Sequence, residues 1–165
     1  GEVEVGGYDP RVGIWNPPFE RLGETCATQS AAFLRVAALV PRLAVEVVAR
    51  EKVGGGHTRV EIRVANGGYL STYGLPSARK LPIAEPLRLT TSGVKLVAPA
   101  ESVIEIGHLE GWGSGLYNGP NVFMPWTRGN PHERFITLVA EGKGKLAVKV
   151  GSSRVGYRTV EVEVG

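Results

Sequence analysis

The sequence predicts a mainly β fold, an antiparallel β-sandwich of immunoglobulin-like or related type, preceded by one amphipathic α-helix. Glycine (23) and proline (11) make up about a fifth of the 165 residues, which favours many short strands and turns over a helical bundle. Apolar residues make up 42% of the chain, enough to bury a core. From residue 43 onward apolar and polar side chains alternate with a period of two, and only residues 19–40 follow a helical period.

The expected helix covers residues 19–40 and ends before Pro41, which cannot continue a helix. Leu22, Cys26 and Phe33 fall on one apolar stripe at helical spacing and form the candidate docking face of the helix. On this stripe Cys26 is expected to be a small buried hydrophobic residue rather than a nucleophile. It is the only cysteine, so no internal disulfide can form.

Eight short strands are expected after the helix, with no further helical segment. They are Leu43–Val47, Val60–Val64, Leu87–Thr91, Val94–Val97, Val103–Ile106, Phe135–Ala140, Leu146–Val150 and Thr159–Val164. Turns are expected at Gly54–Gly56, at Ser92-Gly93 and at Glu141–Gly144. A barrel is the alternative to the sandwich, because periodicity does not distinguish them.

Residues 107–132 differ from the rest of the chain, because they are rich in glycine and proline and carry several aromatic residues. A loop this long is uncommon and is often functional. Trp112, Tyr117 and Trp126 are the candidate ligand or domain contacts, since flat rings can bind a sugar ring or a peptide side chain. The alternative is that these rings cap the core or pack on a neighbouring domain.

Charge and hydropathy indicate neither a nucleic-acid nor a membrane partner. The net charge is +3 and no basic run occurs, so a nucleic acid or an anionic membrane is not expected. No apolar run approaches the 18 residues that a membrane-spanning helix needs. The chain begins without an initiator methionine or a signal peptide, and we expect it to be part of a longer protein.

No residue pattern indicates catalysis, a cofactor or a metal in this chain. His57, His108 and His132 lack the spacing of metal ligands. The glycine-rich segment Gly111–Gly115 has no central serine of a nucleophile elbow and no lysine of a phosphate loop. The carboxylate pairs Glu2/Glu4 and Glu161/Glu163 alternate with valines, which is typical of a solvated strand face. We therefore expect no catalytic, cofactor-binding or metal-binding residue here.

Several segments together resemble the C-terminal region of bacterial zinc carboxypeptidase-like (carboxypeptidase A-type) metallopeptidases. They are Gly1–Pro10 with Asn16–Glu20, the Asn-x-Gly-x-Leu-x-Thr segment within Val64–Thr72, the Gly-x-Leu-x-Gly turn Gly107–Gly111 and the Ser-x-Arg-x-Gly turn Ser152–Gly156. Ser71 departs from the family pattern, which has proline at that position. The matches span nearly the whole chain, and their order and spacing carry the resemblance.

This resemblance implies that residues 1–41 are the tail of an upstream catalytic domain and residues 42–165 an accessory β-sandwich domain. The parent would be a zinc metallocarboxypeptidase, a secreted or periplasmic hydrolase. Its zinc ligands and its substrate-binding arginine would lie upstream, so zinc is expected there and not in this chain. By this resemblance Glu4 would precede the last helix of the catalytic domain, but we assign it no catalytic role.

The expected function is therefore that of a non-catalytic accessory and interaction domain, which packs on or orients its own upstream peptidase domain. When the chain is expressed alone, its exposed contact surface would favour a homodimer. The alternative is a glycan- or peptide-binding sandwich module that uses Trp112, Tyr117 and Trp126 as its platform.

Overall fold

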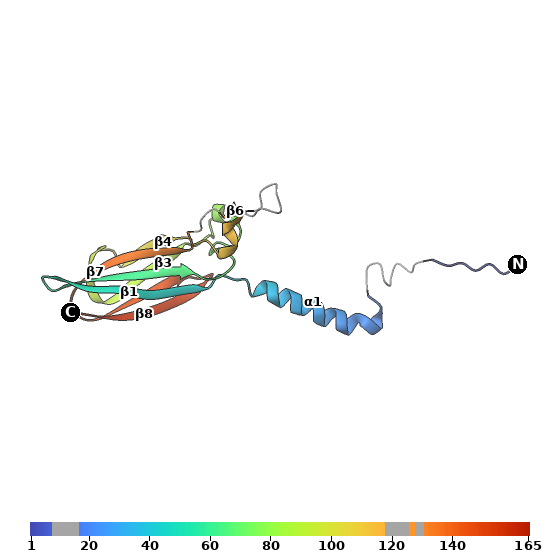
Figure 1. Cartoon of the computed structure of the whole chain (residues 1–165), viewed down its shortest axis with the longest axis horizontal. Coiled ribbons are helices and arrows are strands. Elements are labelled where there is room, and N and C mark those ends of the chain that lie inside the picture. The colour runs from blue at the N-terminus through green and yellow to red at the C-terminus, as the bar shows by residue number, and fades with distance from the viewer. Residues whose placement is uncertain (8–16, 118–125, 128–130) are drawn as a thin grey trace. The chain divides into compact units, whose positions relative to one another are not determined.

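The computed structural model describes residues 1–7, 17–117, 126–127 and 131–165, and side chains only outside residues 115–130. The chain forms two compact units, Gly1–Leu39 and Val40–Gly165 (Figure 1). Within the described residues, no helix is both long and apolar enough to cross a membrane.

The first unit contains the expected helix. A 3-10 turn, η1 (Phe19–Arg21), leads into the α-helix α1 (Leu22–Ala37), which ends three residues earlier than expected. Pro41 explains the early end, because proline disfavours helical backbone in the residue before it and lacks an amide hydrogen. No residue of α1 is buried, and Phe33 is 71% exposed. The expectation of a buried Cys26 is wrong for this chain, because its thiol is free and exposed.

The second unit confirms the mainly β class. Six strands form one antiparallel sheet. Five of them follow the order β1-β2-β7-β3-β4, and the sixth, β8, pairs with β7 outside this order. Two shorter strands, β5 and β6, pair with each other. The strands are β1 (Leu43–Gly54), β2 (His57–Asn66), β3 (Leu87–Ala98), β4 (Val103–Gly107), β5 (Leu116–Tyr117), β6 (Trp126–Thr127), β7 (Glu133–Ser152) and β8 (Gly156–Val164).

Two expected turns prove to be bends inside long strands. The segments expected to flank Ser92-Gly93 form the single strand β3, and those expected to flank Glu141–Gly144 form the single strand β7. The glycines bend each strand without reversing it, since Gly93 has φ +96°, Gly142 +100° and Gly144 +138°. The two bends lie beside each other, because Gly93 pairs with Leu146 and the register shifts directly after it.

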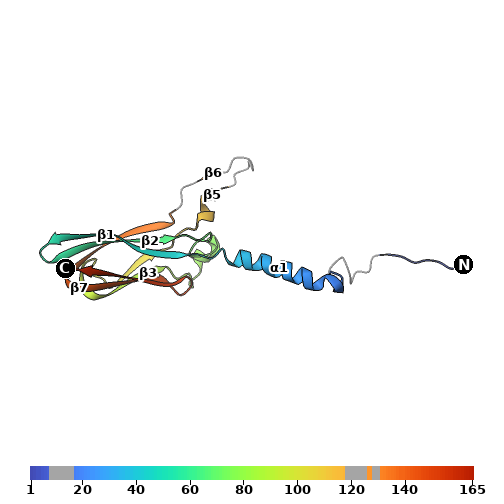
Figure 2. The same cartoon turned by 60° about the horizontal axis from the view of Figure 1, so that its bottom comes forward.

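The bend of β7 changes its pairing partner. Before the bend, residues 133–141 pair with β2; after it, residues 144–152 pair with β8. Strand β3 pairs with both halves of β7, along the edge of β7 opposite to β2 and β8. Figures 1 and 2 show the β1–β2 hairpin and the end of β8 together at one end of the unit, which we call the hairpin end. β5 and β6 lie at the opposite end, the loop end.

The predicted alternation places one face of each strand in the core. Val60, Ile62 and Val64 of β2 are completely buried, as are Leu138 and Ala140 of β7 before its bend. The second half of β7 and the neighbouring strands bury their alternate residues in the same cluster, namely Leu87, Leu89, Leu146, Val148, Val150, Val162 and Val164. Burial of each such side chain contributes roughly 1.5–3 kcal/mol. One core therefore joins both halves of the bent sheet and gives the loop end a rigid base.

Candidate functional site at the loop end of the sheet

Asn66, the last residue of β2, ties three segments of the loop end together. Its side chain is 1% exposed and fully hydrogen-bonded. The Oδ1 atom accepts hydrogen bonds from the amides of Arg42 and Gly68, both at 2.9 Å. The Nδ2 group donates to the carbonyls of Leu70 at 2.8 Å and Glu110 at 3.1 Å. Because an asparagine amide offers both donors and acceptors, this one side chain makes all four hydrogen bonds.

Three glycines at the loop end lie where the backbone has no room for a side chain. A Cβ on Gly68 would overlap the Val40 carbonyl, and one on Gly111 would overlap the Tyr69 carbonyl. A Cβ on Gly113 would lie 2.5 Å from the Tyr69 ring. The Asn-x-Gly and Gly-x-Leu-x-Gly segments therefore pack directly against neighbouring backbone, which explains why these positions are glycine.

A cluster of titratable side chains lies against these loops. The Tyr73 hydroxyl donates a hydrogen bond of 2.6 Å to Oε2 of Glu110. The His108 ring stands edge-on to the Tyr73 ring, with 5.7 Å between the ring centroids. The guanidinium of Arg79 lies 5.2 Å from the Tyr73 centroid, within the range of a cation–π contact. Tyr73 is only 6% exposed, His108 and Glu110 are partly buried, and Arg79 is exposed.

The surroundings shift the pKa values of this cluster. Burial, and then the hydrogen bond to Glu110, raises the pKa of the Tyr73 phenol above its ordinary value. Burial, and then the positive charge of Arg79, lowers the pKa of His108. The Nδ1 atom of His108 is buried and has no hydrogen-bond partner among the described residues. At neutral pH the cluster thus holds a protonated phenol and a neutral imidazole, both of which can form hydrogen bonds.

Trp112 is the one residue of the predicted aromatic platform whose side chain the structure describes. It is 55% exposed, and its ring centroid lies 4.5 Å from that of Tyr69 in an edge-on arrangement. Tyr117 and Trp126 pair in the backbone of β5 and β6, but their side chains lie outside the described residues. The structure therefore brings two of the three backbone positions together and leaves the shared aromatic surface a prediction.

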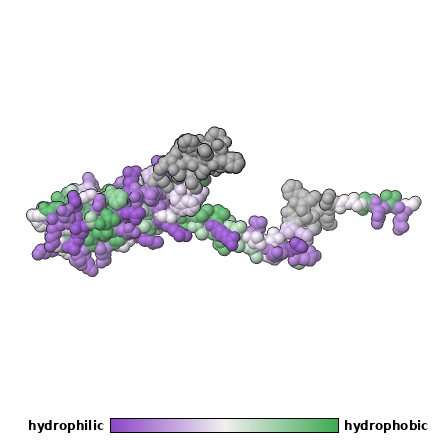
Figure 3. All heavy atoms as spheres, viewed as in Figure 1, coloured by the Kyte–Doolittle hydropathy of each residue, from purple (hydrophilic) through white to green (hydrophobic). Residues whose placement is uncertain are grey.

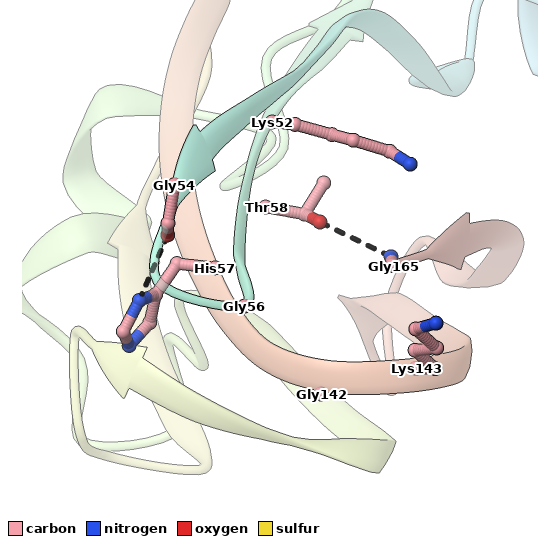
Figure 4. A pocket seen from close by; sticks show the side chains of 8 residues that line it. All are labelled: Lys52, Gly54, Gly56, His57, Thr58, Gly142, Lys143 and Gly165. Carbon is pink, nitrogen blue, oxygen red and sulfur yellow. Dashed lines mark hydrogen bonds between the residues drawn. The ribbon is translucent and has the colours of Figure 1, made fainter.

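Two pockets lie at opposite ends of the second unit. The loop-end pocket, about 370 Å³, is lined by Val40, Pro41, Leu70, Ser71, Gly74, Arg154 and Val155. The hairpin-end pocket, about 320 Å³, is lined by Lys52, Gly54, Gly56, His57, Thr58, Gly142, Lys143 and Gly165. Figure 4 shows the side chains of Lys52 and Lys143 on either side of Gly165, whose amide donates a hydrogen bond of 3.2 Å to Thr58 Oγ1. Backbone of the chain itself therefore lies between these two lysines.

The structure adds residues that the sequence did not single out. Arg154 was part of a turn motif without a role of its own, and in the fold it lines the loop-end pocket. His57 lies at the hairpin end, whereas His108 belongs to the loop-end cluster. Within the described residues, no three His, Cys, Asp or Glu side chains gather closely enough to hold a metal ion. The signal for the site was the recurrence of Asn, Gly and Arg in short motifs that converge only in the fold.

Comparison with known proteins places the second unit in a family. No curated protein matches the sequence. The crystal structure of DesR, a beta-glucosidase from Streptomyces venezuelae in complex with D-glucose, is similar with a TM-score of 0.30 and 13% sequence identity. That match covers 76% of this chain and 15% of that chain, so this chain spans a small part of that protein, and the likeness supports no argument about function. A family model described as a domain of unknown function, DUF8731, matches residues 42–163, and the chain therefore belongs to that family.

Proposed function

We propose that this chain is the non-catalytic C-terminal accessory domain of a zinc carboxypeptidase-like metallopeptidase, which docks on its own upstream peptidase domain through α1. The observation that carries this proposal is the apolar surface of α1. The helix has no buried residue, and Phe33, Leu34 and Val36 are 71%, 66% and 64% exposed. Figure 3 shows hydrophobic residues along the C-terminal half of this helix. An amphipathic helix gains most of its stability by burying such a face, so we expect α1 to pack against a partner surface.

The peptidase domain is the partner that the sequence motifs favour. The Gly1–Pro10 and Asn16–Glu20 segments precede α1, and both resemble the tail of the catalytic domain in that family. In this arrangement the zinc and its ligands would belong to the upstream domain, where the metal would supply Lewis-acid chemistry for peptide hydrolysis. The present chain positions that domain or narrows access to its cleft. Secretion or periplasmic localisation is part of the same proposal.

We also propose that the bent sheet forms an immunoglobulin-like or related β-sandwich. Strand β7 pairs with β2 before its bend and with β8 after it, while one core cluster takes side chains from both halves. Two facing layers that share long, bent strands would produce this pairing. Such a layer pair is a rigid platform, which suits a domain whose task is to hold another in place.

The first test is the upstream reading frame of the gene. We expect it to encode a peptidase domain with a His-x-x-Glu and a later histidine, the residue set that binds catalytic zinc. An upstream frame without these residues contradicts the proposal and favours the glycan- or peptide-binding alternative, for which the exposed Trp112 is the supporting observation.

The second test measures docking directly. The separately produced peptidase domain is mixed with the chain, and association is followed by analytical ultracentrifugation. Phe33→Glu should abolish the complex, because it places a charge on the apolar face. Ala31→Glu is the matched control, since residue 31 lies on the opposite side of the helix and is also exposed. Association that survives Phe33→Glu, or is lost equally in both variants, contradicts docking through this face.

A further inference from the structure

The loop-end pocket combines one charged group with apolar walls. Val40, Pro41, Leu70 and Val155 supply the apolar lining, and Arg154 is the one charged residue on it. The volume of about 370 Å³ lies within the range of pockets that hold small ligands. The Asn-x-Gly-x-Leu-x-Thr segment and the Ser-x-Arg-x-Gly turn, which are more than 80 residues apart in the chain, thus meet in one concave site.

The other polar groups of this pocket already have partners. The Ser71 hydroxyl donates a hydrogen bond of 2.8 Å to the Gly74 carbonyl, and the Gly74 amide donates one of 2.9 Å to the Ser71 carbonyl. Arg154 differs, because the structure gives it no hydrogen bond or ion pair with any residue that it describes. A Cβ built on Gly74 would lie 3.6 Å from Arg154 Nη1, so the guanidinium end lies against the Gly74 wall of the pocket.

No carboxylate that the structure describes forms an ion pair with the guanidinium of Arg154, because the two carboxylates in the neighbouring loops are hydrogen-bonded elsewhere. The carboxylate of Glu110 accepts the hydrogen bond of Tyr73, and the carboxylate of Glu85 accepts bonds from the Ser153 amide and hydroxyl. Arg154 adds to the positive field that, after burial and Arg79, lowers the pKa of His108, against the opposing effects of Glu105 and Glu110. A ligand carboxylate could therefore pair with this guanidinium without displacing any partner among the described residues.

We propose that the loop-end pocket binds a carboxylate carried on an apolar body, of the kind presented by the C-terminus of a peptide that ends in an aliphatic residue. The Arg154 fork pairs with the carboxylate in the bidentate geometry that guanidinium groups favour. The aliphatic group contacts Leu70, Val155 and Val40. A sugar would need several donors and acceptors on the walls, and a phosphate dianion would favour more than one cation, so the single arginine selects a monocarboxylate.

The test is an NMR titration of the full ¹⁵N-labelled chain with the tripeptide Ala-Ala-Leu as the free acid. We expect saturable shifts at the amides of Ser71, Gly74 and Val155, and no saturable shift with the C-terminal amide of the same tripeptide. Arg154→Gln should weaken binding about tenfold or more, the effect of losing a charge-assisted pair. Arg154→Lys should weaken binding less, because lysine keeps the positive charge but cannot form the two parallel hydrogen bonds of a guanidinium. Acetyl-leucine binding as tightly as the tripeptide would identify a free acid, rather than a peptide end, as the ligand.

Matched variants separate this site from general charge and from helix docking. Arg158→Gln removes the same charge from an exposed position on β8 outside the pocket and should leave the affinity unchanged. Phe33→Glu should also leave it unchanged, since Phe33 is not among the residues that line the pocket. Equal shifts with the acid and the amide, or an equal loss in Arg154→Gln and Arg158→Gln, overturn the proposal. Because Arg154 is exposed, Arg154→Gln should keep the dispersed spectrum of a folded chain.

Discussion

The hydroxyl of Tyr73 and the carboxylate of Glu110, 37 residues apart in the chain, are joined by a hydrogen bond of 2.6 Å. The Tyr73 ring is 6% exposed, so this bond is made where water competes little. It connects the loop after β2 to the loop after β4, the two segments that Asn66 also joins. The loop end of the sheet is thus held by side chains as well as by strand pairing.

The first prediction concerns that bond. Tyr73→Phe should lower the free energy of unfolding by about 2 kcal/mol, because it removes a shielded hydrogen bond to a charged group. Urea unfolding followed by circular dichroism measures the change. Tyr157→Phe is the control, since Tyr157 is 48% exposed and its hydroxyl has no hydrogen bond to the described residues. Equal losses in both variants would show that the Tyr73–Glu110 bond contributes nothing specific.

The second prediction is a loss of stability in mild acid that depends on His108. Its pKa in the folded chain is lowered from the ordinary 6.5, so the unfolded chain takes up a proton first as the pH falls. The stability from neutral His108 is complete above pH 6.5 and is lost as the pH falls through the folded pKa. In denaturant unfolding across this range, His108→Gln should flatten the dependence of stability on pH. A profile unchanged by His108→Gln contradicts this assignment.

Glu85 titrates in a different window, which keeps the two effects apart. The hydroxyl of Ser153, and then its amide, lowers the pKa of the Glu85 carboxyl below the ordinary 4.5. Its contribution is therefore present above pH 4.5 and is lost only as the pH falls through the lower folded pKa.

The third prediction concerns the side chain of Asn66. Asn66→Ala should lower the free energy of unfolding by roughly 3 kcal/mol, because four hydrogen bonds are lost and their buried partners are left unsatisfied. Asn66→Asp should also destabilise the fold, since aspartate keeps the acceptor but lacks the two donors to Leu70 and Glu110. Urea unfolding measures both. An aspartate variant as stable as the parent would mean that the two donated bonds are dispensable.

The fourth prediction compares two glycines with opposite surroundings. Gly111→Ala should destabilise the chain by about 2 kcal/mol or more, because its Cβ would overlap the Tyr69 and Leu70 backbone. Gly23→Ala is the matched control: Gly23 lies in α1 with nothing within 4 Å, and alanine there should raise helix content. Thermal unfolding and circular dichroism give the two readouts. A Gly111→Ala variant as stable as the parent would show that the backbone yields at this point.

The mainly β class and the alternating core were predictable because both follow from local periodicity. Val60, Ile62 and Val64 point to the core because a strand places alternate residues on one face. The two bends were not predictable in the same way. Gly93 and Gly142 carry turn chemistry, and only long-range pairing of β3 with β7 decides that each bends a strand instead of ending it. Local signals for a turn and for a glycine bend are nearly the same.

The loop-end site was predictable only as scattered motifs. Asn66 precedes two glycines, which indicates the end of a strand, but its hydrogen bond to the Glu110 carbonyl spans 44 residues. Arg154 reaches the Gly74 wall only after β7 and β8 have paired. Such contacts depend on topology, which period and propensity do not specify.

The fifth prediction decides between the two candidate uses of Trp112. Under the docking function its ring is a packing element against Tyr69, and Trp112→Ala should destabilise the fold by about 1 kcal/mol, with Trp112→Phe retaining most of that contact. Tryptophan fluorescence of the parent chain should then stay unchanged when soluble cell-wall fragments or chitin oligomers are added. A glycan platform requires the opposite result. The parent would show a saturable fluorescence shift, and Trp112→Ala would abolish it while the chain stays folded.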